Sequence, residues 1–171
     1  NFLPIIDYSA DGKGDFLEAL VKKKKPKSAL EVGALVGYSA IKTIRNLPKD
    51  GKLVTLERDA ANAKVTAQNL KKAGMDKQAT VVVGNALSTI PKLKGTFDFV
   101  FIDAAKEDYI NYLLLLEKHG LLAKNATILA DNVKVFKAEV SDYLDYVRNT
   151  GRYKSKYHDF GDDAMELSER A

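Results

Sequence analysis

The chain has 171 residues, of which 46% are hydrophobic, and a formal net charge of +4 at pH 7. This length and composition suit one folded domain over residues 1–171 and argue against disorder. It has no cysteine and only two histidines, which excludes disulfides and thiolate sites and leaves oxygen as the expected metal ligand. No apolar run approaches the roughly 20 residues of a membrane-spanning helix, so we expect a cytoplasmic protein without a membrane partner.

Basic residues concentrate near the start of the chain, in "VKKKKPK" at 21–27. Lysines that close a helix before a proline interact favourably with the helix dipole, and this interpretation is favoured. A short basic run is also compatible with a nucleic-acid patch, although nucleic acid is not the expected partner.

Short β-branched or aromatic runs alternate with helical stretches along most of the chain. The predicted strands lie at 28–33, 52–57, 79–85, 97–103 and 126–132. The predicted helices lie at 38–47, 59–74 with Asp59 as N-cap and Gly74 as C-cap, 107–120, and near 137–149. Strands that alternate with helices imply crossovers and a parallel sheet.

The tail has a different pattern. The segments "RYKSKYHDF" and "DAMELSER" flank the turn signal "GDD", which predicts a closing antiparallel hairpin. The sequence therefore predicts an α/β, Rossmann-like parallel sheet with helices on both faces and a C-terminal antiparallel hairpin.

Ligands of open α/β sheets bind beyond the carboxyl ends of the strands. There, Gly33 and Gly37 predict a tight turn into a helix, and Glu57 ends the second strand, where it can accept hydrogen bonds from ribose hydroxyls. The spacing G-x-x-x-G differs from the dinucleotide pattern, and Glu31 would repel a pyrophosphate. An adenosine ligand with a cationic group fits better, although a purely structural turn stays open.

Acidic and amide side chains end the fourth and fifth strands. Asp103 follows one, and Asp131 with Asn132 follows the other. Neighbouring parallel strands would bring these oxygens together, with Lys106 one turn beyond Asp103, as a site for a hard cation such as Mg²⁺. For any one of these residues alone, a polar strand end or a helix cap is the favoured interpretation, and only the set together favours a site.

Several segments in order, including "LEVGALVGYSAIKT", "LVTLERD", "FDFVFIDAAKEDY" and "ILADNV", carry a family resemblance. From about Lys13 to the end, the chain resembles the metal-dependent class I O-methyltransferases that use S-adenosylmethionine, and most closely the catechol O-methyltransferases of the caffeoyl-CoA O-methyltransferase superfamily. The resemblance implies the class I methyltransferase fold, a small catechol-type substrate, and a monomer or homodimer.

The resemblance also implies roles for individual residues. Asp103, Asp131 and Asn132 would bind Mg²⁺, and Lys106 would be the general base. Residues implied at the S-adenosylmethionine site are Ser9 through its backbone, Glu31, Gly33 at the methionine portion, Ser39 at the carboxylate, Glu57 at the ribose, Ala86 and Asp103.

Methyl transfer to a phenol explains why an acid, a metal and an amine would be needed together. A phenol with a pKa near 10 is mostly protonated at neutral pH. Two vicinal hydroxyls that chelate Mg²⁺ would lose a proton more easily, and the dication would favour the neutral amine of Lys106 as acceptor.

The chain departs from the family pattern at several positions. Ala104 and Ala105 stand where mammalian catechol enzymes have a histidine and a tryptophan, and Ala86 replaces a serine that contacts adenine. Asp159 is only a candidate for the late acidic residue that binds the second substrate hydroxyl. Helices that the family has before the first strand are largely missing, so we expect an incomplete cofactor lid if nothing precedes Asn1.

Two alternative functions stay open. One is a bacterial-type methyltransferase acting on hydroxyuridine in transfer RNA, which "DAAK" also resembles and which would use the lysine run. The other is a non-catalytic module that binds an adenosine ligand. A nicotinamide dehydrogenase is disfavoured by the glycine spacing and by Glu31.

Overall fold

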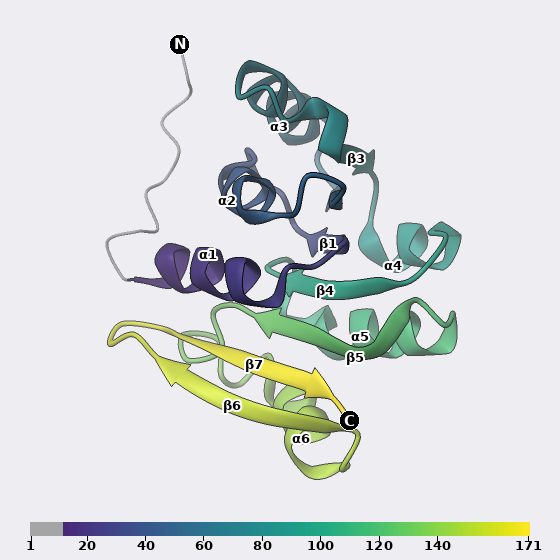
Figure 1. Cartoon of the computed structure of the whole chain (residues 1–171). Coiled ribbons are helices and arrows are strands. Elements are labelled where there is room, and N and C mark those ends of the chain that lie inside the picture. Colours follow the sequence, from purple (N-terminus) through teal and green to yellow (C-terminus); the bar gives the residue numbers. More distant parts are fainter. Residues whose placement is uncertain (1–11) are drawn as a thin grey trace.

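The computed structural model describes residues 12–171, in which seven strands form one sheet (Figure 1). The strand order is β3-β2-β1-β4-β5-β7-β6. The strands are β1 (Ser28–Val32), β2 (Lys52–Glu57), β3 (Ala79–Val83), β4 (Phe97–Ile102), β5 (Leu122–Ala130), β6 (Tyr153–Asp159) and β7 (Ala164–Arg170).

The first five strands pair in parallel, whereas β7 is antiparallel to both β5 and β6. This arrangement confirms the predicted parallel sheet with a closing hairpin. In the strand order, β1 lies between β2 and β4, so the chain leaves the middle of the sheet in two directions. The crevice at such a switch point, beyond the carboxyl ends of the strands, is where α/β sheets bind ligands.

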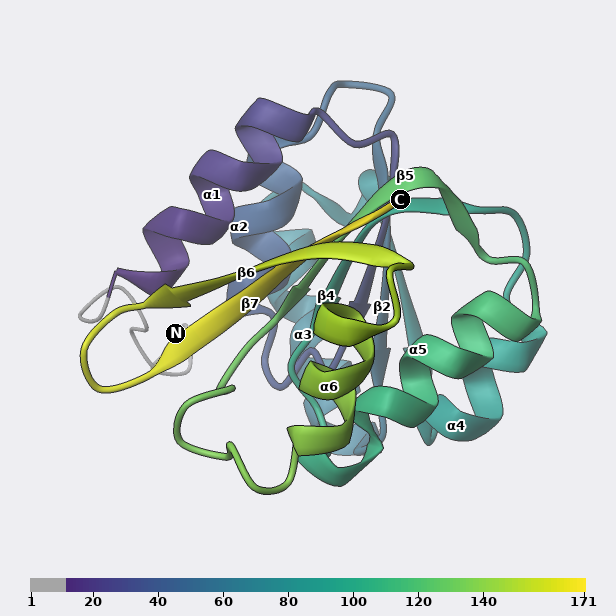
Figure 2. The same cartoon turned by 90° about the horizontal axis from the view of Figure 1, so that it is seen from below.

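Helices cover both faces of the sheet (Figure 2). The helices are α1 (Lys13–Lys24), α2 (Tyr38–Asn46), α3 (Ala60–Lys72), α4 (Ala86–Thr89), α5 (Tyr109–Lys118) and α6 (Ser141–Asn149). One buried cluster joins α1, α2 and α3 to the sheet through side chains such as Leu17, Ile44 and Phe99. A larger cluster joins α4, α5 and α6 to the other face, with Leu113 and Tyr143 fully buried. Apolar burial on both faces explains why the central strands carry continuous apolar runs.

Some predicted element ends were wrong. The strand β5 begins at Leu122 rather than at residue 126, because Phe97 pairs with Leu122 across an irregularity in the β4–β5 register. The helix expected near 137–149 begins at Ser141, since residues 133–140 form turns. The C-cap of α3 is Ala73, and Gly74 follows it with a φ of +72°. The N-cap Asp59 is confirmed, because its side chain accepts the N–H of Asn62 at 2.8 Å.

Among the helices between residues 12 and 171, none is long and apolar enough to cross a membrane.

Candidate functional site

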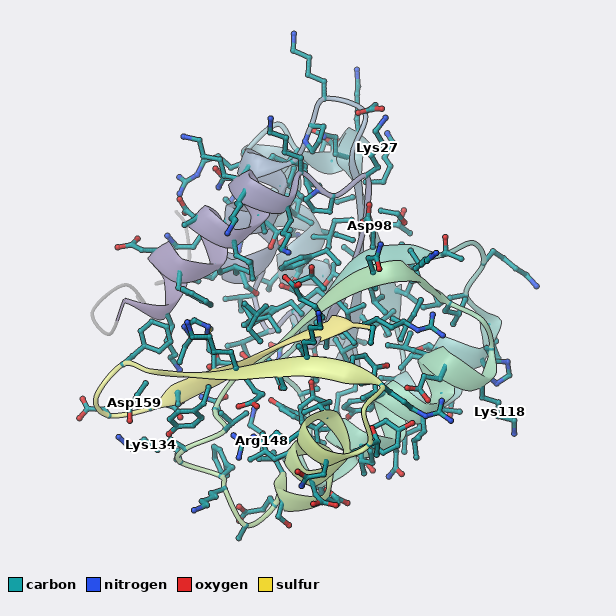
Figure 3. All side chains as sticks on the ribbon, turned by 60° about the horizontal axis from the view of Figure 1, so that its bottom comes forward. Lys27, Asp98, Lys118, Lys134, Arg148 and Asp159 are labelled. Carbon is teal, nitrogen blue, oxygen red and sulfur yellow. The ribbon has the colours of Figure 1, made fainter. Side chains whose placement is uncertain are left out.

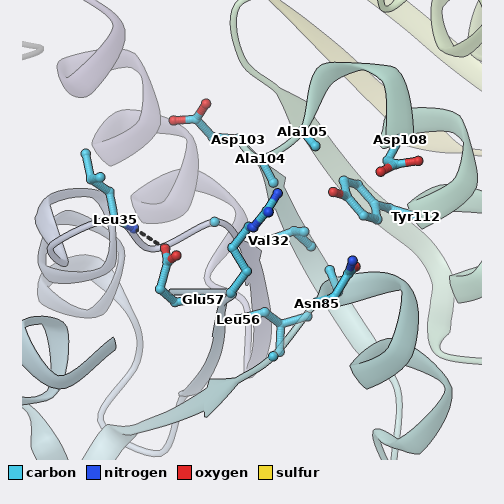
Figure 4. A pocket seen from close by; sticks show the side chains of 14 residues that line it. Val32, Leu35, Leu56, Glu57, Asn85, Asp103, Ala104, Ala105, Asp108 and Tyr112 are labelled. Carbon is cyan, nitrogen blue, oxygen red and sulfur yellow. Dashed lines mark hydrogen bonds between the residues drawn. The ribbon is translucent and has the colours of Figure 1, made fainter. Parts of the chain in front are cut away.

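A cavity of about 290 Å³ opens at the carboxyl ends of β1, β2 and β4. Glu57 and Leu35 lie on one side of it and Tyr112 and Asn85 on the other, with Asp103 at the rim (Figure 4). The cavity therefore occupies the switch point of the sheet, where the sequence predicted a nucleoside site.

Glu57 is the last residue of β2 and is 7% exposed. Its carboxylate accepts two backbone N–H groups, from Leu35 at 2.7 Å and from Asp59 at 3.0 Å. These two hydrogen bonds hold the carboxylate in a fixed orientation. Because each carboxylate oxygen can accept more than one hydrogen bond, the group can still accept hydrogen bonds from a ligand in the cavity.

Gly33 follows β1 and has a φ of +101°. A Cβ atom at this position would lie 2.1 Å from the backbone oxygen of Asp103, a distance that no side chain tolerates. Glycine is required here because the turn after β1 packs directly against the end of β4. The turn and Asp103 are therefore held in fixed relation to each other.

Glu31, inside β1, is buried and hydrogen-bonded. Its carboxyl group accepts the hydroxyl of Ser39 at 2.5 Å and that of Thr55 at 2.6 Å. Burial raises the pKa of Glu31 to about 7, although these two hydrogen bonds act in the opposite direction. A cation that reaches this carboxyl would stabilise its ionised form.

Asp103 and Lys106 form the second part of the site, just beyond β4. The amine of Lys106 donates to Asp103 Oδ1 at 2.9 Å and contacts the hydroxyl of Tyr109 at 3.0 Å. The Tyr109 hydroxyl in turn donates to the backbone oxygen of Asp131 at 3.0 Å. Because Asp131 lies at the end of β5, this chain of contacts confirms that the two strand ends meet.

Asp131 is 3% exposed, and burial together with nearby Asp103 raises its pKa to about 6. Asn132 follows it in the left-handed region, with a φ of +60°. Such a backbone is uncommon for a residue other than glycine, although asparagine adopts it more readily than most. The structure therefore links Asp103, Lys106 and Asp131, and Asn132 joins them through its backbone N–H, which donates to Asp131 Oδ1 at 2.7 Å.

Several residues of this cluster were missed by the sequence reasoning. Lys13 at the start of α1 donates to Asp131 Oδ1 at 3.0 Å and to Asp163 Oδ2 at 2.9 Å. Phe136 places its ring 5.5 Å from the Lys106 amine. No local pattern marks Lys13 or Phe136, and the sequence identifies Asp163 only as part of the turn signal "GDD".

The donor atoms fit a hard divalent cation. In the described part of the chain, no three His, Cys, Asp or Glu side chains gather into a metal site. Asp103 and Asp131 supply two carboxylates, of which Asp131 has a pKa raised by burial and by the charge of Asp103, and Asn132 follows with an amide oxygen. Two carboxylates and an amide form an all-oxygen set that suits Mg²⁺, which commonly keeps further positions for water or substrate.

Two further predicted site residues lie outside the group formed by Asp103, Lys106 and Asp131. Ala86 is 8% exposed and lines the cavity at the start of α4. Asp159 ends β6, where its carboxylate pairs with Lys134 at 3.1 Å (Figure 3). Ser9 lies outside the described residues.

Solved structures with the same fold include O-methyltransferases. The structure of cofactor-bound Rv0187 from MTB aligns with a TM-score of 0.88 and 32% identity, over 98% of this chain and 83% of that one. The O-methyltransferase TomG from Streptomyces achromogenes, in complex with SAM, aligns with a TM-score of 0.86 and 28% identity, over 99% and 83%. The fold is therefore that of a class I methyltransferase.

Sequence comparison identifies the family. The O-methyltransferase family model matches residues 2–155, and the chain belongs to this family. Catechol O-methyltransferase of Mus musculus is 37% identical over 86% of this chain, and that of Sus scrofa is 40% identical over 83%. The chain spans 57% of the mouse relative and 78% of the pig relative.

Proposed function

We propose that this protein transfers a methyl group from S-adenosylmethionine to one hydroxyl of a small catechol-type aromatic, with Mg²⁺ bound. The observation that carries the proposal is the meeting of Asp103, Lys106, Asp131 and Asn132 beside a cavity that contains Glu57. The similarity to catechol O-methyltransferases and the SAM complex of a related fold support the choice of reaction and methyl donor.

The cofactor would occupy the cavity between the turn after β1 and the start of α4. Glu57, held by two backbone N–H groups, would accept the ribose hydroxyls. The buried carboxyl of Glu31 would face the cationic amino group of the methionine portion, with Ser39 beside it. Gly33 would allow close approach of the backbone, and Ala86 would lie against the adenine. The backbone contact of Ser9 remains part of this proposal.

Asp103, Asp131 and Asn132 would hold the magnesium ion. When bound, Mg²⁺ would supply charge that lowers the pKa of the substrate hydroxyls and would orient them toward the methyl donor. The protein's own contribution is a set of oxygens fixed at the ends of two adjacent strands.

Lys106 would act as the general base. Its amine is placed by Asp103 and Tyr109, and it faces the ring of Phe136. In its neutral form the amine would accept the hydroxyl proton as the substrate oxygen bonds to the methyl carbon. When bound, S-adenosylmethionine would supply the methyl group, and S-adenosylhomocysteine would be the product that keeps the electron pair of the carbon–sulfur bond.

The surroundings of Lys106 suit a flat aromatic substrate. Phe136 is 37% exposed and Val135 is 60% exposed, both in the loop after β5. Ala104 and Ala105, between Asp103 and Lys106 in the sequence, line the cavity with small side chains. An exposed aromatic side chain beside a catalytic amine would stack against a phenol ring.

The test is methyl transfer from labelled S-adenosylmethionine to catechol, with Mg²⁺ and with excess chelator. Phenol, which lacks the vicinal hydroxyl, is the matched acceptor. We expect turnover of catechol that chelator abolishes, and little turnover of phenol. Cofactor binding without transfer to any vicinal diol would contradict the proposal, and metal-independent transfer would contradict the role of Mg²⁺.

A further inference from the structure

Asp163 lies at the point where three distant segments of the chain meet. It precedes β7 and is 5% exposed. Its Oδ2 accepts the amine of Lys13 at 2.9 Å and the side-chain amide of Asn132 at 2.7 Å. Its Oδ1 accepts the backbone N–H groups of Lys134 at 3.3 Å and Val135 at 3.2 Å. Both carboxylate oxygens therefore hold the loop that follows β5.

The bond to Asn132 sets the orientation of its amide. An ionised carboxylate only accepts hydrogen bonds, so the nitrogen of the Asn132 side chain, and not its oxygen, must face Asp163. The amide is planar, and its oxygen therefore points away from Asp163. An asparagine that binds a cation does so through this oxygen.

The bond to Lys13 fixes the neighbouring carboxylate. The amine of Lys13, whose residue is only 3% exposed, also donates to Asp131 Oδ1 at 3.0 Å. The same Asp131 oxygen accepts the backbone N–H of Asn132 at 2.7 Å. Asp163 thus restrains both residues beyond β5, one directly and the other through Lys13.

The charges around this point are nearly balanced. Among the described residues, the carboxylates of Asp103, Asp131 and Asp163 pair with the amines of Lys13 and Lys106, so these five groups carry one excess negative charge when all are ionised. The amine of Lys13 is shared between the carboxylates of Asp131 and Asp163. Without Asp163, Asp131 would be the remaining carboxylate in this pair of contacts.

We infer that Asp163 is a positioning residue, which through its hydrogen bonds to Asn132 and Lys13 presents the Asn132 oxygen and the Asp131 carboxylate to a divalent cation. This inference rests on the metal site of the proposed function. Residues that orient metal ligands in this way typically change metal affinity by 10–100-fold when they are replaced.

The experiment measures Mn²⁺ binding by electron paramagnetic resonance in the wild-type protein, Asp163→Asn and Asp162→Asn. Asp162 is the adjacent, exposed aspartate, so its variant makes the same change of charge without touching the site. We expect Mn²⁺ affinity to fall about 10–100-fold in Asp163→Asn and to stay within twofold in Asp162→Asn. S-adenosylmethionine affinity should be unchanged in both.

The outcomes separate this inference from the function on which it rests. Suppose that wild-type protein binds Mn²⁺ and that Asp163→Asn binds it equally well but has a lower melting temperature. Asp163 would then be purely structural, and this result would overturn the inference alone. Wild-type protein that binds no Mn²⁺ would overturn the metal site and the inference together. If Asp163→Asn does not fold, Asp163→Glu keeps the charge opposite Lys13 and should show the same loss of affinity.

Discussion

The two sides of the site are built from different kinds of contact. The glycine-turn side, with Glu31, Gly33 and Glu57, is held by backbone groups and by residues on the neighbouring strand or the next helix. The acidic side, with Asp103, Asp131 and Asn132, is held by side chains from α1, α5 and the hairpin. Backbone N–H groups and hydroxyls close by hold one side, whereas the other depends on charged and polar side chains that reach across the fold.

This difference has a physical basis. The groups on the glycine-turn side would contact a cofactor whose hydroxyls and amino group need fixed acceptors. The carboxylates on the acidic side repel each other, so they need cations to be brought together. Lys13 and Lys106 supply such cations in this structure.

Lys106→Ala should have the largest effect and should damage only the acidic side. Loss of the base lowers kcat by about 10³-fold, because general-base catalysis contributes on the order of 10²–10⁴. Calorimetry should show S-adenosylmethionine affinity within about twofold of wild type. Lys118→Ala, an exposed lysine at the end of α5, is the control. An equal loss of cofactor affinity in Lys106→Ala would make Lys106 structural.

Gly33→Ala should disturb both sides, because this turn touches Asp103. We expect the free energy of unfolding to fall by about 2–4 kcal/mol, since the new Cβ meets a backbone oxygen and φ is positive. Gly74→Ala is a matched control, with a similar positive φ and no atom within 4 Å of the added Cβ. It should cost about 1 kcal/mol in denaturant titrations. Equal costs would remove the argument for a tight contact.

Glu57→Gln should weaken only the glycine-turn side. The amide nitrogen of the new glutamine would face the N–H of Leu35 or Asp59, where Glu57 has an accepting oxygen. The side chain would then be displaced from the position proposed to bind the ribose, so S-adenosylmethionine affinity should fall about tenfold. Mn²⁺ binding should not change. Glu169→Gln on β7 is the control. A loss of Mn²⁺ affinity in Glu57→Gln would show that the two sides are not independent.

The pH dependence of cofactor binding should show the smallest effect. Without cofactor, Glu31 has a pKa of about 7, so it is mostly protonated at pH 6 and ionised at pH 8. A cationic amino group prefers the ionised form, so affinity should rise by up to about tenfold from pH 6 to pH 8. In Glu31→Gln the same calorimetric series should be flat. Affinity that falls with rising pH in the wild type would contradict contact with a cation.

The same raised pKa makes a prediction for the cofactor-free protein. Because the folded value lies above the ordinary value of 4.5, Glu31 favours the folded state most below pH 4.5. Its contribution to the free energy of unfolding should be lost as pH rises through 7.

Much of the glycine-turn side could be predicted from local sequence. The glycine turn, Glu57 at the end of β2 and the N-cap Asp59 each depend on residues within a few positions. The polar ends of β4 and β5 were also predictable, because consecutive parallel strands place their carboxyl ends at one edge. The start of α6 could not be predicted from local sequence. The loop before it is held by Asp163, which lies far from residues 133–140 in the sequence and leaves no pattern there.

The sequence by itself determined the alternation of strands and helices, the final hairpin, and the order of acidic and glycine residues at the strand ends. Periodic burial and short-range turn chemistry decide these features. Only the tertiary structure decided that Lys13 and Asp163 reach Asp131 and Asn132, across separations of 118 residues and 31 residues. Hydrogen bonds and charge pairs act over a few ångströms of space, so contacts between distant segments exist only once the sheet and its hairpin have formed.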